Sequence, residues 1–111
     1  MIIAVPLVSG TLCQHFGHCE SFAVMEVDSV GNVVSKKELT PPPHEPGVLP
    51  VWLHSLGVNH VIAGGMGSRA QGIFYEQGIS VTVGAPSALP EELAAAHIRG
   101  ELTSGDNVCD H

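Results

Sequence analysis

Positively charged residues are scarce in this chain, which has four Lys and Arg against eleven Asp and Glu and a net charge of −7 with His neutral. Such a surface repels a nucleic-acid backbone, so we expect no nucleic-acid partner. Long apolar runs are also missing, because none approaches the roughly 18 to 20 residues that a membrane span requires. The opening Met1 to Val5 lacks a basic flank and is followed by Pro6, which indicates a first strand and not a signal peptide.

Cysteine is rare as well, with three in 111 residues. An odd number, with two of them beside histidines, argues against a secreted disulfide scaffold and indicates a reducing cytoplasm. The length predicts a single domain, residues 1–111, with a real hydrophobic core and no room for a second catalytic domain.

Metal-binding side chains gather in the segment Cys13-Gln14-His15-Phe16-Gly17-His18-Cys19, which places two thiols and two imidazoles within seven residues. Thiolate and imidazole are ligands that iron, copper, zinc and iron–sulfur clusters prefer. The alternative is a pair of half-buried cysteines whose histidines pack or hydrogen-bond locally. The spacing is not that of a zinc finger, because the sequence has no second pair of ligands, so further ligands must come from elsewhere in the fold.

The order of apolar segments predicts an α/β fold. Residues 2–7 form an apolar run typical of a central strand, and 21–27 and 33–39 form an antiparallel hairpin around a turn at 28–32. A helix over 48–56, a strand over 58–63, a helix ending near 77, a strand over 79–83 and a helix capped by Ser87 and ending near 99 follow. This β-β-β-α-β-α-β-α order predicts a five-stranded mixed sheet with helices on its faces, a ribonuclease-H-like topology.

Two other segments offer ligands. The proline-rich residues 40–47 form a stiff connector, on which His44 is either an idle loop histidine or a ligand delivered to the first loop. The chain finishes with Cys109 and His111, which a metal shared with the first loop would hold in place.

A glycine-rich turn at residues 64–70 joins a strand to a helix, an arrangement that directs backbone N–H groups and the positive helix end toward an anion. It matches a relaxed dinucleotide fingerprint, but the next strand supplies no acidic residue for a ribose. An anionic ligand other than a nucleotide, held by Gly65, Gly67 and Arg69, is one interpretation. Glycines that serve only a tight turn are the other.

Residues 14–19, 40–47, 64–70 and 109–111 together resemble a known family, the dinitrogenase iron–molybdenum cofactor biosynthesis domain of NifX/NafY-like proteins and of the NifB C-terminus. The resemblance implies a ribonuclease-H-like fold and a protein that holds a metal cluster without turning over a substrate. The Cys-x-x-x-Cys-x-x-Cys site of the radical-enzyme part of NifB is absent from the sequence, so we do not expect cluster synthesis. The ligands that the resemblance implies are His15, His18, Cys19 and His44, and those added on their chemistry are Cys13, Cys109 and His111.

Three functions follow as hypotheses. The first is a carrier or chaperone that holds an iron–sulfur or molybdenum–iron–sulfur cluster, or a single iron or zinc ion, between donor and acceptor proteins, with a homodimer if two chains share one cluster. The second is a zinc- or iron-stabilised regulatory or protein-interaction domain. The third, an enzyme with Cys19 as nucleophile and His15 or His18 as base, ranks last because no orienting third residue is evident. We therefore expect no enzymatic activity.

Overall fold

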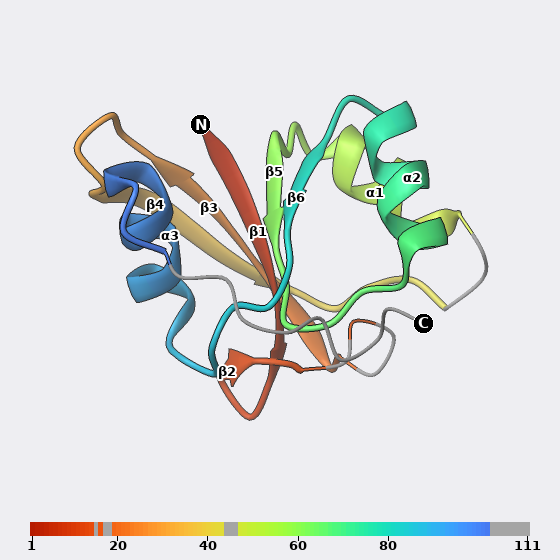
Figure 1. Ribbon diagram of the computed structural model, residues 1–111, viewed down its shortest axis with the longest axis horizontal. Helices are drawn as coiled ribbons and strands as arrows, with labels where there is room; N and C mark the ends of the chain where they lie inside the picture. Colours follow the sequence, from red (N-terminus) through yellow and green to blue (C-terminus); the bar gives the residue numbers. More distant parts are fainter. Residues whose placement is uncertain (15, 17–18, 44–46, 103–111) are drawn as a thin grey trace.

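The computed structural model describes residues 1–14, 16, 19–43 and 47–102. These residues form one mixed sheet of six strands together with three helices (Figure 1). In chain order the elements are β1 (Ile2–Val8), β2 (Thr11–Leu12), β3 (Ser21–Val27), β4 (Val33–Leu39), α1 (Val48–Ser55), β5 (His60–Ile62), α2 (Ser68–Glu76), β6 (Ser80–Thr82) and α3 (Pro90–Arg99).

The sheet has the order β4-β3-β1-β5-β6, and the short strand β2 pairs with the end of β1. Strand β3 runs antiparallel to both of its neighbours, β1 and β4, whereas β5 and β6 run parallel to β1. Both directions agree with the sequence prediction, because the hairpin needs only a tight turn and the later strands return through helices. The carboxyl ends of β1, β5 and β6 therefore lie at one edge of the sheet.

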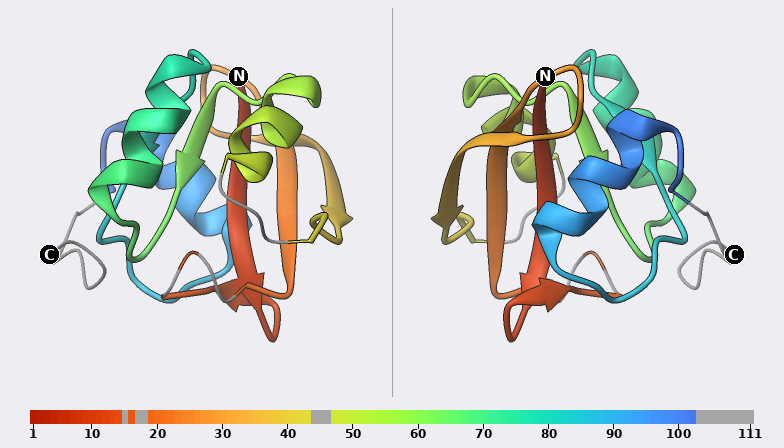
Figure 2. Two further views of the ribbon diagram at one scale, coloured as in Figure 1. Left: turned by 90° about the vertical axis from the view of Figure 1, so that its right-hand side faces the viewer. Right: turned by 90° about the vertical axis from the view of Figure 1, so that its left-hand side faces the viewer.

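Two hydrophobic clusters fill the two faces of the sheet. Alternate residues of β1 divide between them, with Ala4 in the cluster under α1 and α2 and Ile3 and Val5 in the cluster under α3. Figure 2 shows the same division, with α3 on the face opposite to α1 and α2. None of the helices in the described ranges is long and apolar enough for a membrane crossing.

Two details of the prediction were wrong. The strand β2 was not expected, because two residues carry too little periodicity to be recognised. Ser87 was expected to cap the last helix, but α3 begins after Leu89 and has no side-chain cap. The Ser87 hydroxyl instead accepts a hydrogen bond from the side-chain amide of Gln14 at 2.8 Å, so a tertiary contact replaces the local one.

Candidate functional site

The two cysteines of the first loop lie on opposite sides of the end of β1. The N–H of Cys13 donates to the carbonyl oxygen of Pro6, and the N–H of Glu20, next to Cys19, donates to that of Leu7, each at 2.8 Å. The loop that carries the thiols is therefore fixed at both ends to the carboxyl end of a central strand. This is the edge at which open α/β sheets collect their ligands.

Both thiols are buried, with Cys13 4% and Cys19 9% exposed, and both belong to the hydrophobic cluster under α1 and α2. Burial, and then the neighbouring Cys13 thiol, raises the pKa of Cys19 to about 11. The two thiols thus lie near enough to influence each other, and Cys19 is protonated at neutral pH. A protonated thiol is a poor nucleophile, whereas a soft metal ion can displace its proton.

Phe16 anchors the middle of the loop in the core. Its ring packs edge-on against Phe22 of β3 and Phe74 of α2, with centroids 5.8 and 5.6 Å apart. Such aromatic pairs stabilise the fold in addition to the burial of the Phe16 ring, which is 8% exposed. The position of Phe16 between the two cysteines is therefore set by contacts with both the sheet and a helix.

The glycine turn after β5 lies directly against this loop. The N–H of Gly65 donates to Gln14 O at 2.7 Å, and the N–H of Phe16 donates back to Gly65 O at 3.0 Å. At Gly64 a Cβ would lie 2.9 Å from the Cα of Gln14, so only glycine permits this approach. The glycines thus bring two loops together. This contact was not predicted from the sequence, although two glycines after a buried strand are a known signal of close backbone approach.

The segment that precedes α3 completes this edge of the sheet. Leu12 N–H donates to Ala88 O at 3.0 Å, and the Gln14 amide donates to Ser87, as described above. The N–H of Gly84 donates to the carbonyl oxygen of Gly64. Residues 12–14, 16, 64–65 and 84–88 therefore form one connected set of segments at the carboxyl ends of β1, β5 and β6.

The three residues proposed for anion binding differ in their roles. The N–H of Gly65 is used by Gln14 and is not a donor to an anion. Gly67 is the N-cap of α2, and its carbonyl oxygen accepts the N–H of Gln71. Arg69 is exposed in the first turn of α2 and forms no ion pair with any residue that the structure describes. Arg69 is accordingly the group best placed to meet an anion.

The predicted ligands are only partly visible. Cys13 and Cys19 belong to the same hydrophobic cluster at the end of β1, whereas five others lie outside the described residues, namely His15, His18, His44, Cys109 and His111. Within the described part of the chain, no three His, Cys, Asp or Glu side chains are grouped so that they could hold a metal ion. The convergence of all seven ligands on one pocket stays a prediction.

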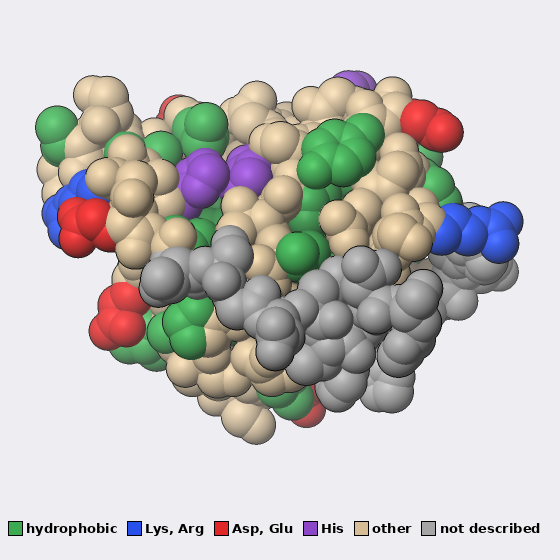
Figure 3. All heavy atoms as spheres, viewed as in Figure 1, with side chains coloured by type: hydrophobic (Ala, Val, Ile, Leu, Met, Phe, Trp, Pro, Cys, Tyr) green, Lys and Arg blue, Asp and Glu red, His purple; other side chains and the backbone are tan. Residues whose placement is uncertain are grey.

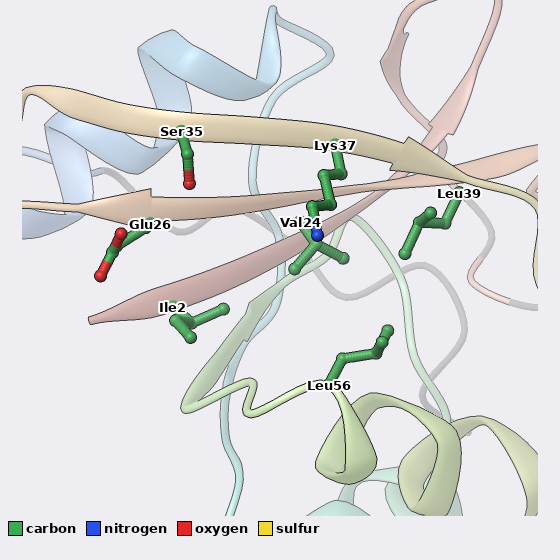
Figure 4. A pocket seen from close by; sticks show the side chains of 7 residues that line it. All are labelled: Ile2, Val24, Glu26, Ser35, Lys37, Leu39 and Leu56. Carbon is green, nitrogen blue, oxygen red and sulfur yellow. The ribbon is translucent and has the colours of Figure 1, made fainter.

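A separate groove lies between β4, β3 and the end of α1 (Figure 4), with a volume of about 190 Å³. Lys37 of β4 pairs across the strands with Val24 of β3, and Leu56 bounds the groove on the helix side. The other lining residues are Ile2, Glu26, Ser35 and Leu39. Since no Cys or His lines it, this groove lacks the soft ligands of the thiol loop.

Comparisons with known proteins agree with this architecture. The uncharacterized protein MJ0580 of Methanocaldococcus jannaschii is 31% identical over 87 residues, which cover 73% of this chain and 72% of that protein. The crystal structure of PH0822 has a TM-score of 0.84 at 27% identity, with 94% of each chain covered. The apo form of the orange protein from Desulfovibrio gigas has a TM-score of 0.73 at 19% identity, covering 96% of this chain and 93% of that one, which shows a shared fold.

The model of one protein family, described as dinitrogenase iron-molybdenum cofactor, matches residues 1–100. The match spans β1 through the end of α3 and includes the thiol loop and the glycine turn. It confirms the resemblance found in the sequence. The chain belongs to the dinitrogenase iron-molybdenum cofactor family.

Proposed function

We propose that this protein is a carrier or chaperone that holds an iron–sulfur or molybdenum–iron–sulfur cluster during assembly or transfer and turns over no substrate. The observation that supports this most directly is the buried pair Cys13 and Cys19, fixed from both sides of β1 at the edge where three loops meet. Membership of a family named for the iron–molybdenum cofactor gives independent support. The name of the orange protein structure, an apo form, indicates that this protein of similar fold has a form with a bound group.

In this proposal the cluster is cargo, and the chain supplies ligands and surroundings. Each thiol gives up a proton when it binds iron, and the apolar cluster around Cys13 and Cys19 shields the thiolates from water. Arg69 compensates the negative charge of the metal cluster, which matters in a chain of net charge −7. Further ligands come from His15, His18, His44, Cys109 and His111. Donor and acceptor proteins in the cytoplasm are the partners that such a carrier needs.

Burial of the thiols also argues against the catalytic alternative. A cysteine nucleophile acts as the thiolate and is exposed to its substrate, but Cys19 is buried and its pKa is raised to about 11. We therefore retain the carrier and not the enzyme. We also retain the ribonuclease-H-like classification as part of the proposal, because three antiparallel strands followed by two parallel ones have that order.

The test is anaerobic reconstitution with ferrous iron and sulfide, with and without molybdate, followed by desalting, metal analysis and a visible absorption spectrum. We expect the wild type to retain iron with a visible absorption band and the double variant Cys13→Ser, Cys19→Ser to lose it. The control is His54→Ala, which removes an exposed imidazole on α1 outside the site. An unloaded wild type, or a double variant that retains as much iron, would contradict the proposal.

The alternative is a zinc- or iron-stabilised regulatory or interaction domain. One observation favours it, because both thiols lie inside the hydrophobic cluster under α1 and α2, where a bound ion would join the loop to the core. Chelator treatment separates the two functions. A structural zinc predicts a melting temperature that falls with metal loss and no visible band at any stage. A carried cluster predicts a band that disappears on transfer while the fold persists.

A further inference from the structure

A second pair of neighbouring side chains lies on the opposite face of the sheet, between β5 and α3. The rings of His60 and His97 are stacked, with centroids 4.1 Å apart and planes inclined by 13°. Figure 3 shows histidine side chains side by side on the surface between α3 and β6. His60 is only 5% exposed and is the one buried polar residue among those that the structure describes. The ring stack is thus a polar contact between the sheet and the end of α3.

The hydrogen bonds of His60 satisfy both ring nitrogens of a neutral imidazole. Its Nδ1 lies 2.6 Å from the Ser80 hydroxyl and its Nε2 lies 2.8 Å from the Thr82 hydroxyl, both on the neighbouring strand β6. Because the Ser80 hydroxyl also donates to the carbonyl oxygen of Asn59 at 3.4 Å, it accepts from Nδ1. Nε2 then accepts from Thr82, and every group in this chain of bonds is satisfied without a charge.

The surroundings offer little to stabilise a charged ring. From β6 only the hydroxyls of Ser80 and Thr82 face His60, and from β1 its register partner is the apolar Ile3. On α3 the titratable neighbour is His97, and the charged residues after it, Arg99 and Glu101, are exposed. Burial, and then the His97 ring, lowers the pKa of His60 to about 4, and burial lowers the pKa of His97.

The helix held by this stack is connected to the thiol loop. The segment before α3 accepts a hydrogen bond from Leu12 N–H at Ala88 O and one from Gln14 at Ser87, on either side of Cys13. A displacement of α3 that includes residues 87 and 88 would therefore change the contacts of the residues on either side of Cys13.

We propose that the His60–His97 stack is a proton-operated latch, which holds the C-terminal half of α3 on the sheet while both rings are neutral and releases it when a proton is taken up. Release of α3 loosens the contacts of residues 87–88 with Leu12 and Gln14. The latch itself does not depend on the proposed function. Its effect on a bound metal, which is to favour release in acid, does rest on that function.

Amide hydrogen exchange on the metal-free protein tests the latch. Two reporters are the N–H of Glu101, which donates to Ala96 O at 2.8 Å, and the N–H of Leu12. After correction for intrinsic rates, we expect their protection to fall by up to about 100-fold from pH 7 to pH 4. The amides of α2, which covers the face of the sheet opposite to α3, should change much less and exclude global unfolding.

The variant for this test is His60→Gln with His97→Phe, which keeps a donor and an acceptor toward β6 and an aromatic ring on α3 but cannot titrate. We expect its reporters to be insensitive to pH, and His54→Gln serves as the matched control. An unchanged protection in the wild type, or an equal loss in the double variant, would overturn the latch. If the variant does not fold, NMR titration of the wild-type rings decides, because a His60 that titrates at 6.5 or above also overturns it.

Iron retention on the reconstituted protein is then measured over the same pH range. If hydrogen exchange shows that the latch opens in acid but the wild type binds no iron at pH 7, the proposed function fails and the latch stands. Iron that is bound at pH 7 and lost equally in acid by the wild type and the untitratable variant means that the latch does not control the site.

Discussion

Gly64 lies so close to Gln14 that a side chain on the glycine would overlap the backbone of its neighbour, since a Cβ there would lie 2.9 Å from Gln14 Cα. The same Cβ would lie 3.1 Å from a methyl carbon of Leu12, whose side chain is buried. A side chain at residue 64 would therefore meet both the backbone of Gln14 and the side chain of Leu12. This contact joins the glycine turn to the loop that carries the thiols.

Gly64→Ala should therefore destabilise the protein by about 1 to 3 kcal/mol, because the two loops must separate. Gly72→Ala is the matched control, since no atom lies within 4 Å of a Cβ at this exposed position in α2. There the better helix former should raise stability by up to about 1 kcal/mol. Urea unfolding of both variants measures the difference, and equal effects would contradict the close approach.

Phe16→Ala should loosen the thiol loop by removing the ring that packs against Phe22 and Phe74. We expect a loss of stability of about 3 kcal/mol and faster alkylation of Cys13 and Cys19 in the folded protein. Tyr75→Ala, which removes an exposed ring from α2, should change stability by no more than about 0.5 kcal/mol. A Phe16 variant with native thiol reactivity would show that the ring does not hold the loop.

The reactivity of Cys19 should depend on pH in a way that reports its burial. Its pKa is raised from 9.0 to about 11. The alkylation rate of Cys19 should therefore rise toward pH 11 in the folded protein, whereas in the unfolded chain it should rise near pH 9. The raised pKa means that the protonated form stabilises the fold below pH 9 and that this contribution is lost as the pH rises toward 11. Mass-spectrometric mapping assigns the site, and Cys13→Ser should shift the profile of Cys19 downward.

Much of the fold could be predicted from local patterns. The hairpin 21–27 and 33–39 was placed correctly, because its turn is fixed by Asp28, whose carboxylate accepts the N–H groups of Val30 and Asn32. The helices and parallel strands were found within a few residues at each end, since apolar periodicity is a property of neighbours in sequence.

The site was harder to predict, because its contacts join residues far apart in the chain. Nothing local indicates that Ser87 meets Gln14, 73 residues away, instead of capping its own helix. His60 looked like an ordinary strand residue, and only the fold shows that β6 and α3 enclose its ring. A ligand set drawn from three segments has the same difficulty, and so the thiols could be named as candidates but their neighbours could not.

The stability of the whole protein should also fall in acid because of His60. Its pKa is lowered from 6.5 to about 4, so the unfolded chain binds a proton more readily between these values. The stabilising contribution is complete above pH 6.5 and is lost as the pH falls toward 4, by up to about 3 kcal/mol. Carboxylates also titrate in this range, so the informative quantity is the difference between the wild type and His60→Gln. Urea unfolding at pH 7 and pH 4 should show a smaller loss in the variant, and equal losses would mean that His60 is as easily protonated in the folded protein as in the unfolded chain.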